Sequence, residues 1–167
     1  MYYYTYPYPY AFQAYNPGQN VHQTHDDQEF RAKKGQNEQV LQALVDGMEG
    51  ESEAIDFYTR LAKMAPTNMA RDAVEHALED EKIHLQLFID LYKNLTGKSP
   101  NYKKRKKQFA NFKEGIMLAY KDELEAYEQY RDDYLLTSDQ EIRDTFFLAM
   151  SDEIEHATRF GFVYHTV

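Results

Sequence analysis

Apolar residues recur at steps of three and four positions in four long segments of this chain. The segments run from about 37 to 64, 68 to 95, 107 to 135 and 139 to 165. Steps of this size bring side chains onto one face of an α-helix, so the pattern predicts four amphipathic helices. The face of the first segment comprises Leu41, Leu44, Met48, Glu51, Ile55, Tyr58 and Ala62. A glutamate thus lies in the middle of an apolar stripe.

The other three segments show the same kind of interruption near their centres. In chain order, the interrupting residues are Glu81, His84, Glu123, Glu153 and His156. Both histidines follow a glutamate at a spacing of three residues, and side chains at this spacing face the same way on a helix. The pattern therefore predicts that four carboxylates and two imidazoles meet in one layer of the core.

The connections between the segments predict how the helices run. Short turns at 66–68 and 137–139 make each pair of helices antiparallel, whereas the connection at about 97–106 is longer. Ten extended residues reach roughly 33 Å, enough to run most of the length of a bundle. We therefore expect an all-α fold at 31–167, an antiparallel four-helix bundle with one long crossover between the second and third helices.

The first 30 residues differ from the rest of the chain and are expected to form an extended tail. The segment MYYYTYPYPYAFQAY contains seven tyrosines, with prolines between them. Proline at this spacing favours extended backbone. Tyrosine also offers a large amphipathic contact area, so the tail is either disordered or an element that bridges subunits.

The second half of the helical region repeats the first. Glu51 precedes Glu81 by 30 residues, and Glu123 precedes Glu153 by the same 30. When residues 51–92 are aligned with residues 123–164, 12 of 42 positions are identical. A long period that occurs only twice is typical of a duplicated helical hairpin rather than a solenoid, which needs about three or more units.

The charge of the predicted layer points to metal ions. A buried carboxylate without a partner costs several kcal/mol, and neither lysine nor arginine lies on the four stripes. Two divalent cations would balance four carboxylates beside neutral imidazoles. Oxygen-rich sites that include histidine suit iron or manganese, and zinc also binds such sites. The predicted ligands are Glu51, Glu81, His84, Glu123, Glu153 and His156.

Four further residues are expected around this site. Metal-bound histidines usually donate their second ring N–H to a carboxylate, so Asp80 is predicted to bond His156, and Asp152 to bond His84, across the bundle. Tyr58 and Tyr130 each lie seven residues after a ligand glutamate, about 10.5 Å further along the same stripe. They are candidate catalytic residues that either hydrogen-bond a ligand glutamate or carry an electron; the alternative is plain core packing.

The segments GESEAIDFY (50–58), EDEKIHLQLF (79–88), DELEAYEQY (122–130) and SDEIEHATRF (151–160) resemble the rubrerythrin/ferritin-like di-iron family. The resemblance covers about residues 37–165. It implies a ferritin-like bundle, a non-haem centre of two iron ions, and reaction with O₂ or H₂O₂. It also implies the ligand role for the six residues above.

The chain departs from rubrerythrins at two points. Rubrerythrins carry a C-terminal rubredoxin domain, whereas this chain ends at Val167 and has no cysteine. Rubrerythrins also have an extra carboxylate three residues after the glutamate of the third helix, where this chain has Ala126. The ligand set therefore resembles the symmetric set of bacterioferritin-type ferroxidase centres.

Composition narrows the classes of partner and compartment. A net charge of −9 argues against nucleic acid and anionic membranes as partners. The lack of cysteine excludes disulfides and thiolate chemistry in this chain. No apolar run approaches the roughly 20 residues that span a bilayer, and the N-terminus lacks the features of a signal peptide, so a cytoplasmic protein is expected. His76 and Glu155 are interpreted as surface residues rather than ligands.

These observations favour a di-iron oxidoreductase of the ferroxidase or peroxide-scavenging type, which would need an external electron donor if it acts as a peroxidase. The alternative is a structural subunit of a coat, shell or filament, in which the tail bridges subunits. The tail resembles those of bacterial spore-coat proteins in composition only. An oxygenase on the same scaffold is a third hypothesis. A homo-oligomer is expected under the first two.

Overall fold

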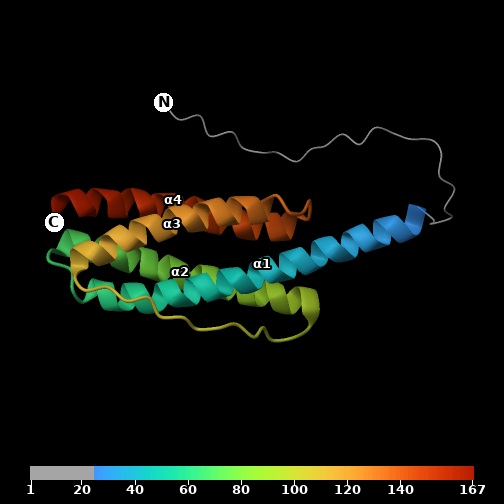
Figure 1. The fold of residues 1–167 in the computed structure, drawn as a ribbon, viewed down its shortest axis with the longest axis horizontal. Helices are drawn as coiled ribbons and strands as arrows, with labels where there is room; N and C mark the ends of the chain where they lie inside the picture. The colour runs from blue at the N-terminus through green and yellow to red at the C-terminus, as the bar shows by residue number, and fades with distance from the viewer. Residues whose placement is uncertain (1–24) are drawn as a thin grey trace, which may run out of the picture.

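The computed structural model describes the backbone of residues 25–167 and side chains from residue 34 onward. This part of the chain forms four α-helices and no strand: α1 His25–Ala62, α2 Asn68–Thr96, α3 Phe112–Tyr134 and α4 Gln140–Thr166. The helices lie lengthwise beside one another (Figure 1). The predicted all-α four-helix bundle is therefore confirmed.

Two helices begin elsewhere than the apolar pattern predicts. Helix α1 begins at His25, well before the expected start near residue 37 and inside the segment 1–30 assigned to the tail. Its first turns are largely polar, and apolar periodicity cannot detect them. Helix α3 begins at Phe112 rather than near residue 107, because Asn111 caps it: the Asn111 side chain accepts a hydrogen bond from Glu114 N. The tyrosine-rich segment up to residue 24 lies outside the described residues.

Side-chain caps and a glycine set the remaining helix ends. Thr67 Oγ1 accepts a hydrogen bond from Ala70 N at 3.1 Å and starts α2. Gly97 ends α2 in the left-handed region at φ 67°, and its N–H donates to Lys93 O at 2.7 Å. A side chain is strained in that region, so glycine suits the position. Thr67 thus marks the turn inside the first hairpin, and Gly97 marks the start of the crossover.

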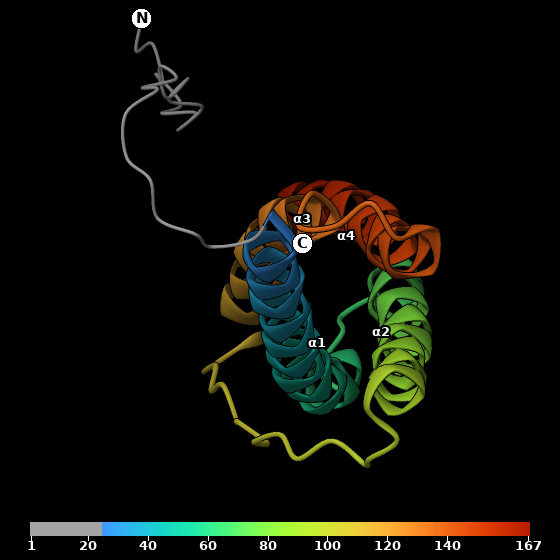
Figure 2. The same ribbon diagram turned by 90° about the vertical axis from the view of Figure 1, so that its right-hand side faces the viewer.

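The bundle consists of two hairpins that face each other. Helix α1 packs mainly on α2, and α3 on α4, while α2 meets α4 and α1 meets α3 less extensively. Viewed along the bundle, the four helices surround a common centre (Figure 2). The crossover between α2 and α3 runs along the outside of the bundle (Figure 1) and ties to α1 through an ion pair of Arg105 with Glu49 at 2.7 Å.

Apolar side chains form a core on each side of the predicted layer. One cluster includes Leu61, Val74 and Phe160, and the other includes Leu44, Phe88 and Phe146. Within the described residues, no helix combines the length and apolarity needed to cross a bilayer. The two clusters leave the polar layer between them, at mid-height of the bundle.

Candidate metal centre

The six predicted ligands lie together in the interior of the bundle. The glutamates come from all four helices and the histidines from α2 and α4, because each residue interrupts the inward stripe of its helix. None is more than 3% exposed; they are Glu51, Glu81, His84, Glu123, Glu153 and His156. Such a buried set of charged groups needs compensation from within the layer.

The six residues divide into two overlapping groups. One group contains Glu51 and His84, the other contains Glu123 and His156, and both contain Glu81 and Glu153. Within each group the candidate ligand atoms lie within 4.8 Å of one another. Each group offers one imidazole, one carboxylate of its own and two shared carboxylates. The arrangement suits two cations held side by side, with the shared carboxylates between them.

Both histidine rings point their Nδ1 atoms into the carboxylates. His84 Nδ1 lies 2.9 Å from Glu81 Oε2 and 3.4 Å from Glu153 Oε1. His156 Nδ1 lies 3.3 Å from Glu81 Oε1 and 3.6 Å from Glu153 Oε2. Each histidine thus approaches the same two glutamates, as expected if the internal repeat places the two hairpins about a pseudo-twofold axis.

The Nε2 atoms of the rings point away from the layer toward two aspartates. His84 Nε2 lies 3.0 Å from Asp152 Oδ2, and His156 Nε2 lies 3.1 Å from Asp80 Oδ2. Both cross-bundle pairs were expected from the sequence. A carboxylate at Nε2 holds the proton on that nitrogen and leaves Nδ1 free for a cation.

The two tyrosines bond the glutamates of the opposite hairpin. Tyr58 OH donates to Glu123 Oε1 at 2.5 Å, and Tyr130 OH donates to Glu51 Oε1. Both rings are also part of the apolar clusters, so packing and hydrogen bonding occur together. Burial raises the pKa of both hydroxyls well above their usual value, and the nearby glutamates raise it further. Both tyrosines therefore stay protonated and donate.

Burial also controls the protonation of the candidate ligands. It raises the pKa of Glu51 and Glu123 well above the usual value; the carboxylates of Glu81 and Glu153 raise the pKa of Glu51 further, and that of Glu153 raises the pKa of Glu123 further. Burial lowers the pKa of His84, but the nearby carboxylates of Glu153 and Glu81 outweigh it and bring that pKa to about 12. Without cations, protons balance part of the negative charge.

Several buried polar atoms of the layer lack a hydrogen-bond partner. They are Glu81 Oε1, Glu153 Oε1 and His156 Nδ1. Leaving such groups unpaired is costly, and all three belong to side chains directed at the middle of the layer. The donor set of four carboxylates and two imidazoles therefore fits a pair of divalent cations.

A cavity of about 490 Å³ reaches the carboxylates between α1 and α3. Small residues from the two helices, Gly50, Ala54 and Ala126, line it beside the ligand glutamates. Ala126 is the position where rubrerythrins carry an extra carboxylate, so its small side chain contributes to this opening. Glu53 and Glu125 also line the cavity. The carboxylate side of the layer is thereby accessible to small molecules.

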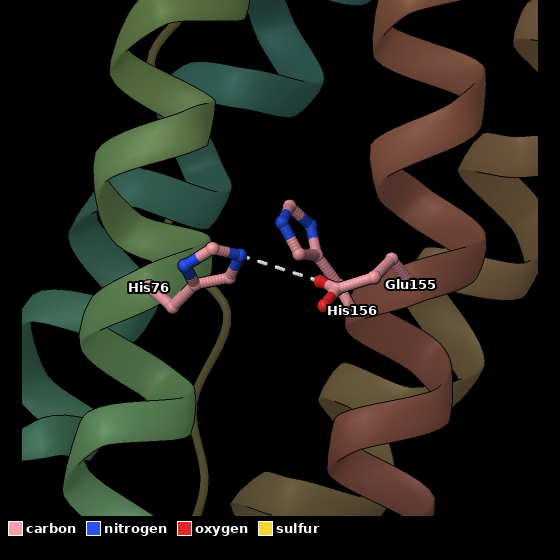
Figure 3. Close-up of side chains that lie close together, drawn as sticks. All are labelled: His76, Glu155 and His156. Carbon is pink, nitrogen blue, oxygen red and sulfur yellow. Dashed lines mark ion pairs between the residues drawn. The ribbon is translucent and has the colours of Figure 1, made fainter.

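The sequence interpretation of His76 is incomplete. Its side chain is 43% exposed, as a surface histidine should be, yet Nε2 lies 3.4 Å from Glu155 Oε2. His76, Glu155 and His156 form a third group of candidate metal ligands, from α2 and α4 (Figure 3). The spacing of four residues from His76 to Asp80 is the one signal in the sequence, and it is too common to identify a site.

Fold and centre together define a ferritin-like four-helix bundle with a buried carboxylate–histidine site. The family model described as Rubrerythrin matches residues 10–92 and 42–164 of this chain. The uncharacterized protein YhjR of Bacillus subtilis (strain 168) is 33% identical over 121 residues, which cover 72% of this chain and 83% of YhjR. The chain belongs to the rubrerythrin family, as its motifs predicted.

Solved structures show the same fold. The ferritin-like, diiron-carboxylate protein of Bacillus anthracis (strain Ames) superposes with a TM-score of 0.67 and 20% identity, covering 75% of this chain and 95% of that one. The dodecameric thioferritin of Bacteroides fragilis, a bacterioferritin-related protein, has a TM-score of 0.69 and 18% identity, covering 83% and 93%. The ferritin-like fold class is confirmed.

Proposed function

We propose that this protein is a di-iron oxidoreductase that oxidises Fe(II) with O₂ or H₂O₂. The observation that carries the proposal is the pair of shared carboxylates, Glu81 and Glu153, which belong to both groups of candidate ligands. Family membership supports a di-iron protein in general terms. The ferroxidase or peroxidase activity is our inference from the centre.

The donor set favours iron over other cations. Four carboxylates and two imidazoles supply hard oxygen donors with borderline nitrogen donors, a mixture that suits Fe(II) and Fe(III), with Mn(II) as the alternative. The absence of cysteine from the sequence removes thiolate as a competing donor for softer metals. Two divalent cations would balance the four carboxylates once the imidazoles are neutral.

Two bound Fe(II) ions would supply one electron each, so that one H₂O₂ takes up two electrons and two protons and becomes two waters. The chain supplies the rest. Asp80 and Asp152 keep the proton on the outer nitrogen of each histidine, which directs Nδ1 inward. Tyr58 and Tyr130 hold Glu123 and Glu51 through their hydroxyls. Apolar clusters on both sides exclude water, which strengthens each of these interactions.

The cavity between α1 and α3 is the route for the oxidant in this proposal. It ends at the ligand glutamates and is large enough for O₂ or H₂O₂, which are a few ångströms long. No residue of this chain is a redox cofactor carrier of the rubredoxin type, because the sequence lacks cysteine. Continued turnover with peroxide would therefore use an external electron donor.

Anaerobic loading followed by rapid mixing tests the proposal. Apo protein receives two equivalents of Fe(II) and is then mixed with O₂ or H₂O₂, and ferric absorption is recorded. We expect oxidation by at least one oxidant in wild type and strong loss in Glu81→Gln/Glu153→Gln. Glu75→Gln/Glu128→Gln, at exposed positions of α2 and α3, is the matched control. Failure of both oxidants to react with the wild-type protein would refute the enzyme proposal.

A second candidate function is that of an assembly subunit. Ile83 and Leu87 of α2 and Leu148 of α4 expose 53%, 37% and 43% of their surface. The thioferritin relative is dodecameric, which supports a homo-oligomer here. The tyrosine-rich segment would then add contacts between copies. Deleting residues 1–24 should reduce the particle mass measured by light scattering; an unchanged mass would contradict a bridging role.

A further inference from the structure

The two sides of the centre that the pseudo-twofold axis relates differ in one respect. Each histidine of the centre bonds an aspartate on the outside of the layer, at 3.0 Å for His84 with Asp152 and 3.1 Å for His156 with Asp80. His76 and Glu155 lie beside the second pair, and Figure 3 shows them next to the ring of His156. The repeat relates the two environments residue by residue.

Apolar residues occupy the equivalent positions on the other side. A shift of 72 residues relates His76 to Leu148 and Glu155 to Ile83. Leu148 and Ile83 are 43% and 53% exposed, so their environment is also at the surface. The His84–Asp152 pair forms beside these apolar residues at the same distance. His76 and Glu155 are therefore not needed to orient the histidine of the centre.

His76 and Glu155 lie as far apart as two ligands of a single cation. His76 Nε2 lies 3.2 Å from Asp80 Oδ2 and 3.4 Å from Glu155 Oε2. Ligands at about 2.0–2.2 Å from a transition metal are separated from one another by roughly 3–3.5 Å. Glu155 Oε1 accepts from Arg159, which leaves Oε2 for this cluster. The side chains of His76 and Glu155 are 43% and 41% exposed, so a cation reaches them from solvent.

We propose that His76 of α2 and Glu155 of α4 form an outer binding site for a divalent transition-metal cation. One imidazole and one carboxylate are donors that such cations take, with water completing the shell. The outer site goes beyond the proposed function, because His76 and Glu155 are not among the six candidate ligands of the centre. Asp80 contacts both His76 and His156 and so links the outer site to the centre.

Removal of the outer site should lower the number of bound cations by one. Apo protein is titrated anaerobically with Co(II), followed by calorimetry and visible absorption. We expect wild type to bind the cations of the centre and one weaker equivalent, and His76→Leu/Glu155→Ile to lose only the weaker one. This variant copies the residues of the opposite side. An unchanged weaker equivalent would overturn the proposal, in this variant or in His76→Gln if the double variant does not fold.

The opposite side allows a test by gain of binding. Leu148→His/Ile83→Glu places the same donors beside Asp152, at exposed positions. The expected result is one additional weak Co(II) equivalent over wild type, and its absence in a folded variant would count against a cation site formed by a histidine and a glutamate at these two positions. Melting temperatures by circular dichroism establish that each variant is folded.

The centre and the outer site can fail separately. In Glu51→Gln/Glu123→Gln the tight equivalents should weaken, while the weak equivalent that depends on His76 remains. Tight binding without a weak His76-dependent equivalent would refute the outer site alone. A His76-dependent equivalent without tight binding in wild type would refute the proposed centre and leave the outer site standing.

Discussion

Two tyrosine hydroxyls extend the carboxylate layer by one hydrogen bond each. Tyr58 bonds Glu123, and Tyr130 bonds Glu51, so each hairpin holds the glutamate of the other. Burial keeps both hydroxyls protonated, because it raises their pKa well above the usual value. Removing one hydroxyl would leave a buried carboxylate oxygen without its donor.

Tyr58→Phe is expected to weaken cation binding at the centre by about tenfold, a typical effect of losing a group that orients a ligand. Calorimetric titration with Co(II) measures the change. Tyr92→Phe is the control, since Tyr92 packs in the apolar cluster rather than at the glutamates. Equal affinities of Tyr58→Phe and wild type would mean that Tyr58 serves packing alone.

Asp133 is the one buried acid of the described residues outside the centre. It is 4% exposed, Oδ1 accepts from Gln129 at 3.0 Å, and Oδ2 has no hydrogen-bond partner. Burial raises its pKa to about 6; the hydrogen bond from Gln129 lowers it, and Asp46 raises it. The folded protein therefore binds this proton more tightly than the unfolded chain does.

The contribution of Asp133 to the free energy of unfolding should fall as pH rises. The contribution is fully present below the unfolded pKa of 3.8 and is lost as pH passes through the folded pKa of about 6. Asp133→Asn should accordingly raise the free energy of unfolding at pH 7 by about 3 kcal/mol, with little gain near pH 4. Urea unfolding at both pH values measures this. A gain of equal size at both would contradict the role of ionisation.

At the scale of the helices, close approach between α1 and α2 depends on a glycine. A Cβ at Gly47 would lie 2.8 Å from Phe88 Cε2 and 3.0 Å from Cδ2. Phe88 is fully buried and also contacts Tyr130 and Phe146 through its ring, so it has little room to move. The glycine allows α1 to lie close to α2 just beside the centre.

Gly47→Ala should destabilise the protein by about 1–3 kcal/mol, because it overfills the core. Gly35→Ala in the same helix is the matched control, since nothing lies within 4 Å of its added Cβ. There the better helix propensity of alanine should stabilise by up to about 1 kcal/mol. Chemical denaturation compares the two. Stabilisation by both substitutions would show that the contact with Phe88 relaxes freely.

The helices themselves were largely predictable, and their starts were not. Apolar steps of three and four identify where each helix faces the core, as at Leu44 or Phe160, both fully buried. The start of α1 lies among polar residues, where periodicity carries no signal. The start of α3 depends on the cap at Asn111. Asparagines occur at many positions of a sequence, so the residue type alone does not identify the one that caps a helix.

At the scale of the whole molecule, the layer opposes folding unless cations are present. Four carboxylates and two imidazoles lie in one buried layer, and the pKa of Glu51 and Glu123 is raised by burial and by their neighbours. Cations that bind only the folded state stabilise it, by about 2.7 kcal/mol at a concentration 100 times the dissociation constant.

Addition of Fe(II) under anaerobic conditions, or of Co(II), should raise the melting temperature of the apo protein. Glu51→Gln/Glu123→Gln should melt higher than wild type without metal, because the buried layer no longer has to hold or protonate these two carboxylates, and should gain less on metal addition. Differential scanning calorimetry measures both effects. If the melting temperature of the wild-type protein did not change on metal addition, a buried cation pair would be contradicted.

Which residues meet in the layer could be predicted because each interrupts an apolar stripe at mid-helix. Their role as ligands stays a prediction. The cross-bundle pairs of Asp80 and Asp152 could be predicted because a metal-bound histidine usually donates its second ring N–H to a carboxylate. The cluster at His76 could not be predicted, since it depends on the lateral spacing of α2 and α4, which no pattern along one helix specifies.

The twofold relation between the hairpins has a consequence for ancestry. A gene encoding a single hairpin would already have specified every donor of the centre, provided that two identical copies associated. Joining the copies in one polypeptide released corresponding positions from having to remain alike. His76 and Leu148 then descend from one ancestral position and differ now, so the surface beside His156 could acquire chemistry that the surface beside His84 never shared.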